Sequence, residues 1–138
     1  VGTMALQHHT DPGILTLVRQ DLTGGLQTLT QDQHWIGVQP QAGTIVVNLG
    51  DAMQVWSNDA YRAAIRRVTP RNRSARYSTP YFYNPKSYAS LSPIPHLTQD
   101  PPHFRPFTCR EYIKGRVDDN FTDLGVDDIQ IDRFRIAV

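Results

Sequence analysis

The sequence predicts a mainly β protein of the sandwich or barrel type, folded as a single domain. Short β-rich runs recur between residues 6 and 83, and turn signals separate them about every 8 to 12 residues. The 138 residues suffice for one sizeable core but not for two domains of ordinary length. Hydrophobic residues make up 39% and charged residues 20% of the chain, which is typical of a globular protein.

The predicted strands follow one another as an antiparallel meander. Gly and Pro at 24–25 and 40–43, and the polar residues 31–33, are the turn signals that separate the first four strands. The six predicted strands are residues 14–19, 26–30, 34–39, 44–49, 61–68 and 76–83. This β part takes up about residues 1–84 of the single domain 1–138.

The second part of the chain has a different texture. Six prolines between residues 85 and 106 and little periodicity predict an irregular loop, neither strand nor helix. Thr108 and Glu111 have the spacing of a capping box, which predicts a helix over residues 109–116 in a C-terminal part that spans about 107–138. Residues 129–138 alternate only partly and receive no assignment.

Composition excludes several classes of protein. The longest apolar run, residues 44–49, is far shorter than the roughly 20 residues that a membrane helix needs. The first residues show neither a basic nor an apolar segment of the kind found in signal peptides. Cys109 is the single cysteine, so no internal disulfide can form. We therefore expect a protein of a reducing compartment, the cytoplasm, with no membrane partner.

The charge balance does not indicate a nucleic-acid-binding protein. Fourteen Lys and Arg against 13 Asp and Glu give a formal net charge of +1. Six arginines (62, 66, 67, 71, 73 and 76) form a run without an acid, and the C-terminal part carries seven acids (111, 118, 119, 123, 127, 128 and 132). We interpret these as a basic loop and a solvated acidic helix. A nucleic-acid groove is the alternative, but the basic run lacks interleaved aromatic residues.

His9-Thr10-Asp11 carries the chemistry of the sequence. In a strand, residues i and i+2 point to the same face, so the imidazole and the carboxylate could meet one metal ion while Thr10 faces away. Two histidines and one carboxylate form the facial triad of non-haem Fe(II) oxygenases. The triplet therefore offers two of three such ligands, and by itself it is a weak signal.

Further motifs accompany the triplet in a fixed order. They are residues 8–13, 20–21 with 24–27, Trp35, 47–51 with 54–58, and 76–82. Together they closely resemble the 2-oxoglutarate and Fe(II)-dependent dioxygenases of the isopenicillin N synthase-like family, which includes flavonoid and gibberellin oxygenases. The resemblance covers residues 1–85 densely, and the Pro-rich loop with residues 107–113 more loosely.

The resemblance implies a double-stranded β-helix, or jelly-roll, that oxidises a small organic molecule by hydroxylation or desaturation. It implies that His9 and Asp11 bind Fe(II), and that Arg76 and Ser78 hold the far carboxylate of the cosubstrate 2-oxoglutarate. The chemistry agrees, because an Arg fork matches a carboxylate and a hydroxyl two residues along a strand lies on the same face. Beside this family pattern, Asp51 is interpreted as a turn residue and Trp56 as a core aromatic residue.

One position departs from the family. Its third ligand is a histidine in an H-R-V segment, and Arg66 stands there in the segment 65–68. A guanidinium stays protonated, has no available lone pair and repels a cation. The remaining histidines (8, 34, 96 and 103) lie opposite His9 on the strand or in segments that the family does not bring to the metal. We therefore expect a substituted site with two protein ligands.

The extent of the chain is a second departure. Family members carry a long N-terminal region, which supplies the first barrel strand and part of the substrate pocket, whereas this chain begins a few residues before His9. We expect a fragment or a reduced member, whose unpaired edge would pair with the missing segment or with another chain. The functional alternatives to an active oxygenase are a catalytically inactive binding module and a plain interaction domain.

Overall fold

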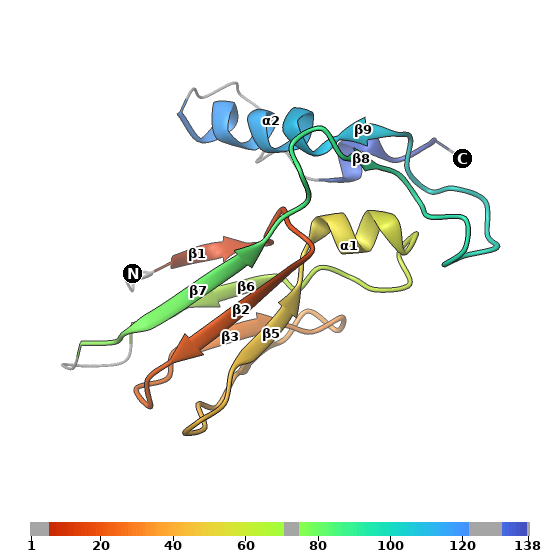
Figure 1. Cartoon of the computed structure of the whole chain (residues 1–138). Coiled ribbons are helices and arrows are strands. Elements are labelled where there is room, and N and C mark those ends of the chain that lie inside the picture. Colours follow the sequence, from red (N-terminus) through yellow and green to blue (C-terminus); the bar gives the residue numbers. More distant parts are fainter. Residues whose placement is uncertain (1–5, 71–74, 122–130, 138) are drawn as a thin grey trace.

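Two antiparallel sheets form the main body of the protein, seen one behind the other in Figure 1. The computed structural model describes residues 6–70, 75–121 and 131–137. The first sheet has the order β1 (Leu6–His9), β6 (Arg66–Val68), β3 (Leu26–Leu29), β4 (Trp35–Gly37), and the second has the order β5 (Val46–Leu49), β2 (Leu15–Gln20), β7 (Ser78–Tyr83). The chain crosses repeatedly between the sheets, as in a jelly-roll.

A helical layer lies beyond one end of the sheets (Figure 1). It contains α1 (Asp51–Trp56), the short hairpin of β8 (Ser90–Leu91) and β9 (Phe107–Thr108), α2 (Cys109–Phe121) and the 3-10 helix η1 (Ile131–Phe134). An isolated bridge between Phe104 and Arg135 joins the end of the Pro-rich loop to the tail. We call the hairpin, α2 and η1 the C-terminal cap.

The strand β2 is the centre of the second sheet. It pairs with β5 on one side and with β7 on the other, so that Thr16 lies opposite both Asn48 and Phe82. Thr16 and Val18 are buried, whereas their neighbours along the strand are more exposed. This alternation follows from the period of two in a strand, and it turns one face of β2 toward the first sheet.

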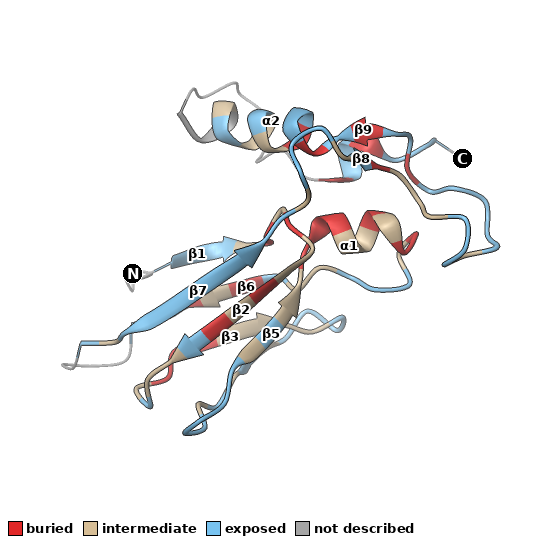
Figure 2. Ribbon diagram, viewed as in Figure 1, coloured by how far each residue is buried: buried red, intermediate tan, exposed pale blue. Residues whose placement is uncertain are grey.

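Burial is concentrated where α1 meets the C-terminal cap (Figure 2). The buried core cluster consists of Ala52, Val55, Leu91, Phe104, Phe107, Cys109, Tyr112, Ile131 and Phe134. In contrast, all six residues of β7 are exposed. The hydrophobic core of the described chain therefore lies at the end of the sheets and not between them.

Two glycines allow three backbone segments to meet at the start of α1. A Cβ at Gly50 would lie 2.4 Å from the carbonyl oxygen of Gly13, and one at Gly13 would lie 2.9 Å from that of Tyr83. The amide of Asp51 donates to the carbonyl of Asp11 at 2.8 Å, and the amide of Ala52 donates to that of Gly13 at 3.1 Å. The first turn of α1 is thus held by the segment that follows β1.

The predicted strands are present, with shorter or shifted bounds. The runs predicted at 14–19, 26–30, 34–39 and 44–49 correspond to β2, β3, β4 and β5. Two predictions were wrong in extent: residues 61–65 precede β6 without being strand, and Arg76 precedes β7. The helix α1 was missed altogether, and Asp51, which we interpreted as a turn residue, is its first residue.

The C-terminal predictions were mostly correct. Thr108 accepts a hydrogen bond from the amide of Glu111 at 3.1 Å, which confirms the predicted cap, and α2 runs beyond the predicted end to Phe121. The loop 85–106 does contain a strand, because the two residues of β8 pair with β9. Of the unassigned stretch 129–138, residues 131–134 form η1, while 129, 130 and 138 lie outside the described residues. Nowhere in the described ranges is a helix long and apolar enough to cross a membrane.

The charge pattern also needs correction. Arg66 and Arg67 lie in β6, and Arg66 is buried, so this part of the arginine run is not a solvated loop. Arg67 stacks over the ring of Trp35 at 4.0 Å. Residues 71–74 of the run and 123–128 of the acidic tail lie outside the described residues.

Candidate metal and cosubstrate site

The Asp11 carboxylate joins the two sheets at the end that faces α1. His9 is the last residue of β1, and Asp11 follows in the turn to β2, so the prediction that both residues lie in one strand was wrong. Their side chains nevertheless approach each other, with His9 Nε2 3.8 Å from Asp11 Oδ1. Thr10 faces elsewhere and donates to the carboxylate of Asp51 at 3.0 Å.

The imidazole of His9 is oriented by its own strand. Its Nδ1 lies 2.8 Å from the carbonyl oxygen of Gln7. Because a carbonyl oxygen can only accept, Nδ1 is the donor in this contact, and the neutral tautomer that fits it has its lone pair on Nε2. Nε2, the atom nearer to Asp11, is therefore the one that can act as a ligand.

Arg66 lies opposite His9 in the pairing of β1 with β6, and its guanidinium reaches Asp11. Its Nη2 forms an ion pair with Asp11 Oδ2. The side chains of Arg66 and Asp11 are only 9% and 5% exposed, so this ion pair is almost fully removed from water. Arg66 thus points into the space where the resemblance places the metal.

Two further groups from the second sheet hold the same carboxylate. The hydroxyl of Thr16 donates to Asp11 Oδ2, and so does the amide of Asn48, at 3.3 Å. Burial raises the pKa of Asp11, but the hydrogen bonds from Thr16, Arg66 and Asn48 and the charge of Arg66 outweigh burial. The pKa of Asp11 therefore lies below its ordinary value, and the carboxylate is ionised at neutral pH.

These residues fit a divalent ion in donor type but not in arrangement. An imidazole nitrogen and a carboxylate are donors that Fe(II) accepts. However, the described residues contain no group of three His, Cys, Asp or Glu side chains that could hold a metal. Asp11 Oδ2 is already paired with the guanidinium of Arg66, and a guanidinium cannot act as a metal ligand. Of the other histidines, His103 is engaged elsewhere, 2.9 Å from Asp59.

Arg76 and Ser78 form the second predicted pair, at the start of β7. Arg76 Nη1 donates to Ser78 Oγ at 2.9 Å, Nε donates to the carbonyl of Gly24 at 2.8 Å, and Nη2 donates to Gln20 Oε1 at 3.1 Å. Three contacts on three nitrogens fix the guanidinium plane. A guanidinium held in this way is oriented in advance for a carboxylate.

The strand β2 relates the two pairs of residues. Thr16 contacts Asp11, and Gln20, four residues further along the regular strand, contacts Arg76. Residues i and i+4 of a strand share one face and lie about 13 Å apart along it. The two pairs therefore lie along the same face of β2. A cavity of about 360 Å³ is lined by residues 22–26 and 37–40, and these include Gly24, whose carbonyl accepts a hydrogen bond from Arg76.

A buried network behind the site was not predicted from the sequence. Asp51 Oδ2 accepts hydrogen bonds from Tyr112 at 2.7 Å and from Arg116 at 3.1 Å, both on α2. Burial raises the pKa of Asp51 to about 6, although the hydrogen bond from Tyr112 and the charge of Arg116 act in the opposite direction. Through Asp51 and Thr10, α2 is connected to the segment that carries His9 and Asp11.

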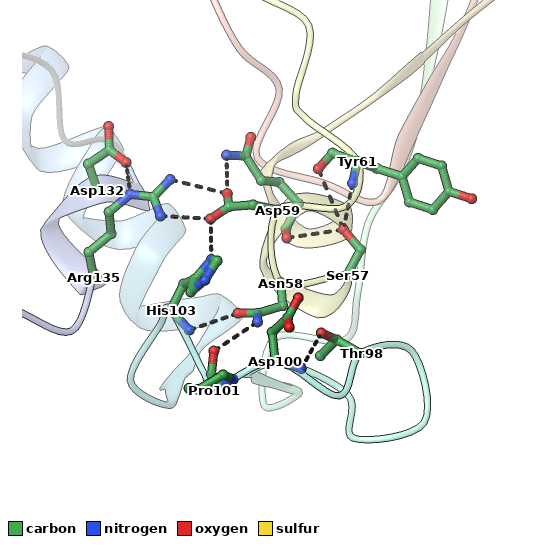
Figure 3. Close-up of polar contacts among 11 residues, drawn as sticks. Ser57, Asn58, Asp59, Tyr61, Thr98, Asp100, Pro101, His103, Asp132 and Arg135 are labelled. Atoms are coloured by element: carbon green, nitrogen blue, oxygen red, sulfur yellow. Dashed lines mark hydrogen bonds and ion pairs between the residues drawn. The ribbon is translucent and has the colours of Figure 1, made fainter. Parts of the chain in front are cut away.

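A second polar cluster ties α1 to the loop and the tail (Figure 3). Asp59, which follows α1, accepts from Gln54 at 2.8 Å and from Arg135 at 2.7 Å. Asn58 donates to the carbonyl of Pro101 at 3.0 Å and accepts from the amide of His103 at 2.7 Å. This cluster lies apart from Asp11 and serves to fasten the C-terminal cap.

The two facing antiparallel sheets, with the chain crossing between them, are those of a jelly-roll protein. The family described as "2OG-Fe(II) oxygenase superfamily" matches residues 2–85, more than half of the chain. The chain belongs to this superfamily, whose members use Fe(II) and 2-oxoglutarate.

Relatives of known activity agree with this assignment. Gibberellin 2-beta-dioxygenase 5 of Oryza sativa subsp. japonica is 38% identical over 122 residues, which cover 86% of this chain and 36% of the relative. Gibberellin 3-beta-dioxygenase 1 of Arabidopsis thaliana is 34% identical over 113 residues, covering 80% and 32%. The chain thus spans about a third of the length of these curated relatives.

Solved structures show the same fold. A full-length protein of Neurospora crassa, solved in complex with alpha-KG, superposes with a TM-score of 0.77 at 31% identity, covering 85% of this chain and 38% of that protein. The rice dioxygenase for auxin oxidation gives a TM-score of 0.83 at 29% identity, covering 99% and 46%. The chain therefore has the fold of part of a 2-oxoglutarate oxygenase jelly-roll.

Proposed function

We propose that this chain is the cosubstrate-binding part of an oxygenase that hydroxylates or desaturates a small organic molecule, folded as one domain. The observation that carries the proposal is the guanidinium of Arg76, fixed by Gly24, Gln20 and Ser78. Relatives named gibberellin 2-beta-dioxygenase and feruloyl CoA ortho-hydroxylase support a small organic substrate.

In this proposal, Arg76 and Ser78 bind the far carboxylate of 2-oxoglutarate. The guanidinium supplies the charge and the paired donors, and the Ser78 hydroxyl, which lies 2.9 Å from Arg76 Nη1, adds a hydrogen bond. His9 and Asp11 are the proposed protein ligands of Fe(II). The pair His9 and Asp11 and the pair Arg76 and Ser78 lie along the same face of β2. This arrangement supports a cosubstrate that lies between the two pairs.

The test is a calorimetric titration with 2-oxoglutarate. Arg76→Lys should weaken binding about tenfold or more, because an ammonium lacks the planar fork. Arg67→Lys is the matched control, since Arg67 lies over Trp35 and has no role in the proposed anchor. If Arg76→Lys binds 2-oxoglutarate as tightly as the parent chain, Arg76 is not the anchor.

The ion pair between Arg66 and Asp11 favours a second candidate, a catalytically inactive binding module. Such a module would bind 2-oxoglutarate without producing succinate. Succinate formation with Fe(II) and dioxygen, measured in parallel with the titration, distinguishes the two. Binding with no succinate would support the module, and binding with succinate would support the oxygenase.

We also propose that the edge strand β7 pairs with a segment that would precede residue 1 or with another chain. Support comes from its six exposed residues, among them Tyr81, 61% exposed, and Phe82, 48% exposed. Tyr81→Lys should reduce self-association in light scattering if another copy pairs there. The single buried Cys109 supports a reducing compartment, the cytoplasm, which a fluorescent fusion would test, and the net charge of +1 argues against a nucleic-acid partner.

A further inference from the structure

The charge of Arg66 is buried inside the fold. Its side chain is 9% exposed, and it faces His9 across the pairing of β1 with β6. Nη2 binds Asp11, while Nη1 is buried and finds no hydrogen-bond acceptor among the described residues. A buried cation is tolerated only when a nearby anion compensates it, and Asp11 is that anion.

The partners of Asp11 come from both sheets. Arg66 comes from β6 of the first sheet, whereas Thr16 and Asn48 come from β2 and β5 of the second. All three contact the same oxygen, Oδ2. The carboxylate therefore connects the two sheets. Its Oδ2 atom is already satisfied by these three side chains of the same chain.

A divalent ion would need the same carboxylate. It would bring two positive charges close to a guanidinium that cannot lose its proton, and the two cations would repel each other in a site almost closed to water. The ion would also gain only two protein ligands, His9 and Asp11, from the part of the chain that the structure describes. Binding of the divalent ion to Asp11 therefore requires the guanidinium to leave.

We infer that the Arg66 guanidinium and a divalent metal ion are alternative occupants of Asp11, and that the guanidinium is the resident one. Arg66 supplies, from within the chain, the positive charge that a metal ion would otherwise place beside Asp11. This inference rests on the proposed ligand role of His9 and Asp11, but not on 2-oxoglutarate binding or turnover.

The test uses the full chain and Mn²⁺, a divalent ion that needs no anaerobic handling. Binding is followed by electron paramagnetic resonance of free Mn²⁺, and stability by thermal unfolding with Mn²⁺ or with EDTA. The parent chain should bind Mn²⁺ weakly, and it should unfold at the same temperature with Mn²⁺ as with EDTA. Arg66→His should bind at least about 100-fold more tightly, since even outer partners of metal ligands change metal affinity about 10–100-fold.

The control is Arg67→His, the next residue of the same strand. Its side chain binds Gln27 and stacks on Trp35, so the new imidazole should bring no gain in Mn²⁺ affinity. The inference is overturned if the parent binds Mn²⁺ as tightly as Arg66→His, or if EDTA lowers the unfolding temperature of the parent. Failure of the Arg76 titration would leave these results unchanged, so the two proposals fail separately.

A double-mutant cycle decides the matter if Arg66→His does not fold. Asp11→Asn leaves the guanidinium without its anion, and Arg66→Met leaves the carboxylate without its cation. The double variant should therefore unfold at a higher temperature than the sum of the two single shifts predicts. Additive shifts would show that the two side chains do not stabilise each other, and would overturn the inference.

Discussion

The sheets and the C-terminal cap bury different kinds of side chain. The buried apolar side chains of the two main sheets are Leu26, at 6% exposure, and Val18 and Val68, at 8%. In the cap, Leu91 and Tyr112 are fully buried. The sheets instead bury Asp11 and Arg66, so the site occupies volume that an apolar core would otherwise fill. The larger apolar cluster therefore lies where α1 meets the cap, whereas the buried charges of the site lie at the sheets.

Stacked aromatic rings form the centre of the cap. Phe107 and Phe134 lie parallel at 3.8 Å between ring centroids, and Tyr112 meets each of them edge-on at 5.9 Å. The three rings come from β9, α2 and η1, so they fasten η1 to the consecutive elements β9 and α2. Area burial and ring geometry both contribute to such a cluster.

Phe134→Ala is expected to have the largest effect on stability. It removes a ring that is 4% exposed and leaves a cavity, which costs about 3–5 kcal/mol of the free energy of unfolding. Val18→Ala, a smaller truncation in the sheets, should cost about 1–2 kcal/mol. Urea unfolding of both variants measures the contrast, and equal costs would mean that the cap is not the main core.

The second largest effect should appear in the pH dependence of stability. The pKa of Asp51 is about 6 in the folded chain, above its ordinary value of 3.8, so the folded state holds this proton more tightly. Stability should therefore fall by about 2–3 kcal/mol as pH rises from about 4 to 6. Asp51→Asn should remove this fall. Parallel curves for the parent and Asp51→Asn would show that Asp51 titrates normally.

Thr108→Ala should have a smaller effect, confined to the start of α2. It removes the side-chain acceptor for the Glu111 amide and should cost about 1 kcal/mol. Thr108→Ser keeps the acceptor and is the control. A loss as large in Thr108→Ser as in Thr108→Ala would point to the methyl group rather than to the cap.

The smallest predicted effect concerns the cluster in Figure 3. Burial raises the pKa of Asp59, but hydrogen bonds from Arg135, Gln54 and His103 outweigh it and hold the pKa near 2. The stabilisation is therefore present above pH 4 and is lost as pH falls toward 2. Since Arg135 is 39% exposed, Asp59→Asn should cost less than about 1 kcal/mol at pH 7. The measurement is the free energy of unfolding of the parent and of Asp59→Asn between pH 2 and pH 7. A difference that does not change with pH would contradict the lowered pKa of Asp59.

Local sequence signals predicted β2 to β7 and the start of α2, because alternation, turn residues and a side-chain cap act over a few residues; β1, β8 and β9 were missed. The six-residue helix α1 gave no such signal. Its N-cap is Gly50, which has no side chain to cap it, and its first amides bind the carbonyls of Asp11 and Gly13. Contacts between distant segments therefore determine this helix.

The candidate site was predictable to a similar extent. Family resemblance indicated His9, Asp11, Arg76 and Ser78, and the chemistry of Arg66 marked it as the departure. Thr16 and Asn48 could not be found, because only the pairing of β2 with β5 brings them together beside Asp11. The buried contact of Asp51 with α2 likewise joins residues 61 apart in the sequence.

Gly13 and Gly50 limit how this chain can vary. At Gly50 an added Cβ would meet only backbone atoms, those of Gly13 and Asp11, and at Gly13 it would meet the side-chain oxygen of Asn84 and the carbonyl oxygen of Tyr83. Any substitution there must move a main-chain segment attached to Asp11 or to Tyr83. In a library of random variants selected for folding, these two codons should therefore stay fixed. Substitutions should instead accumulate at residues 79–83 of β7, whose side chains are exposed.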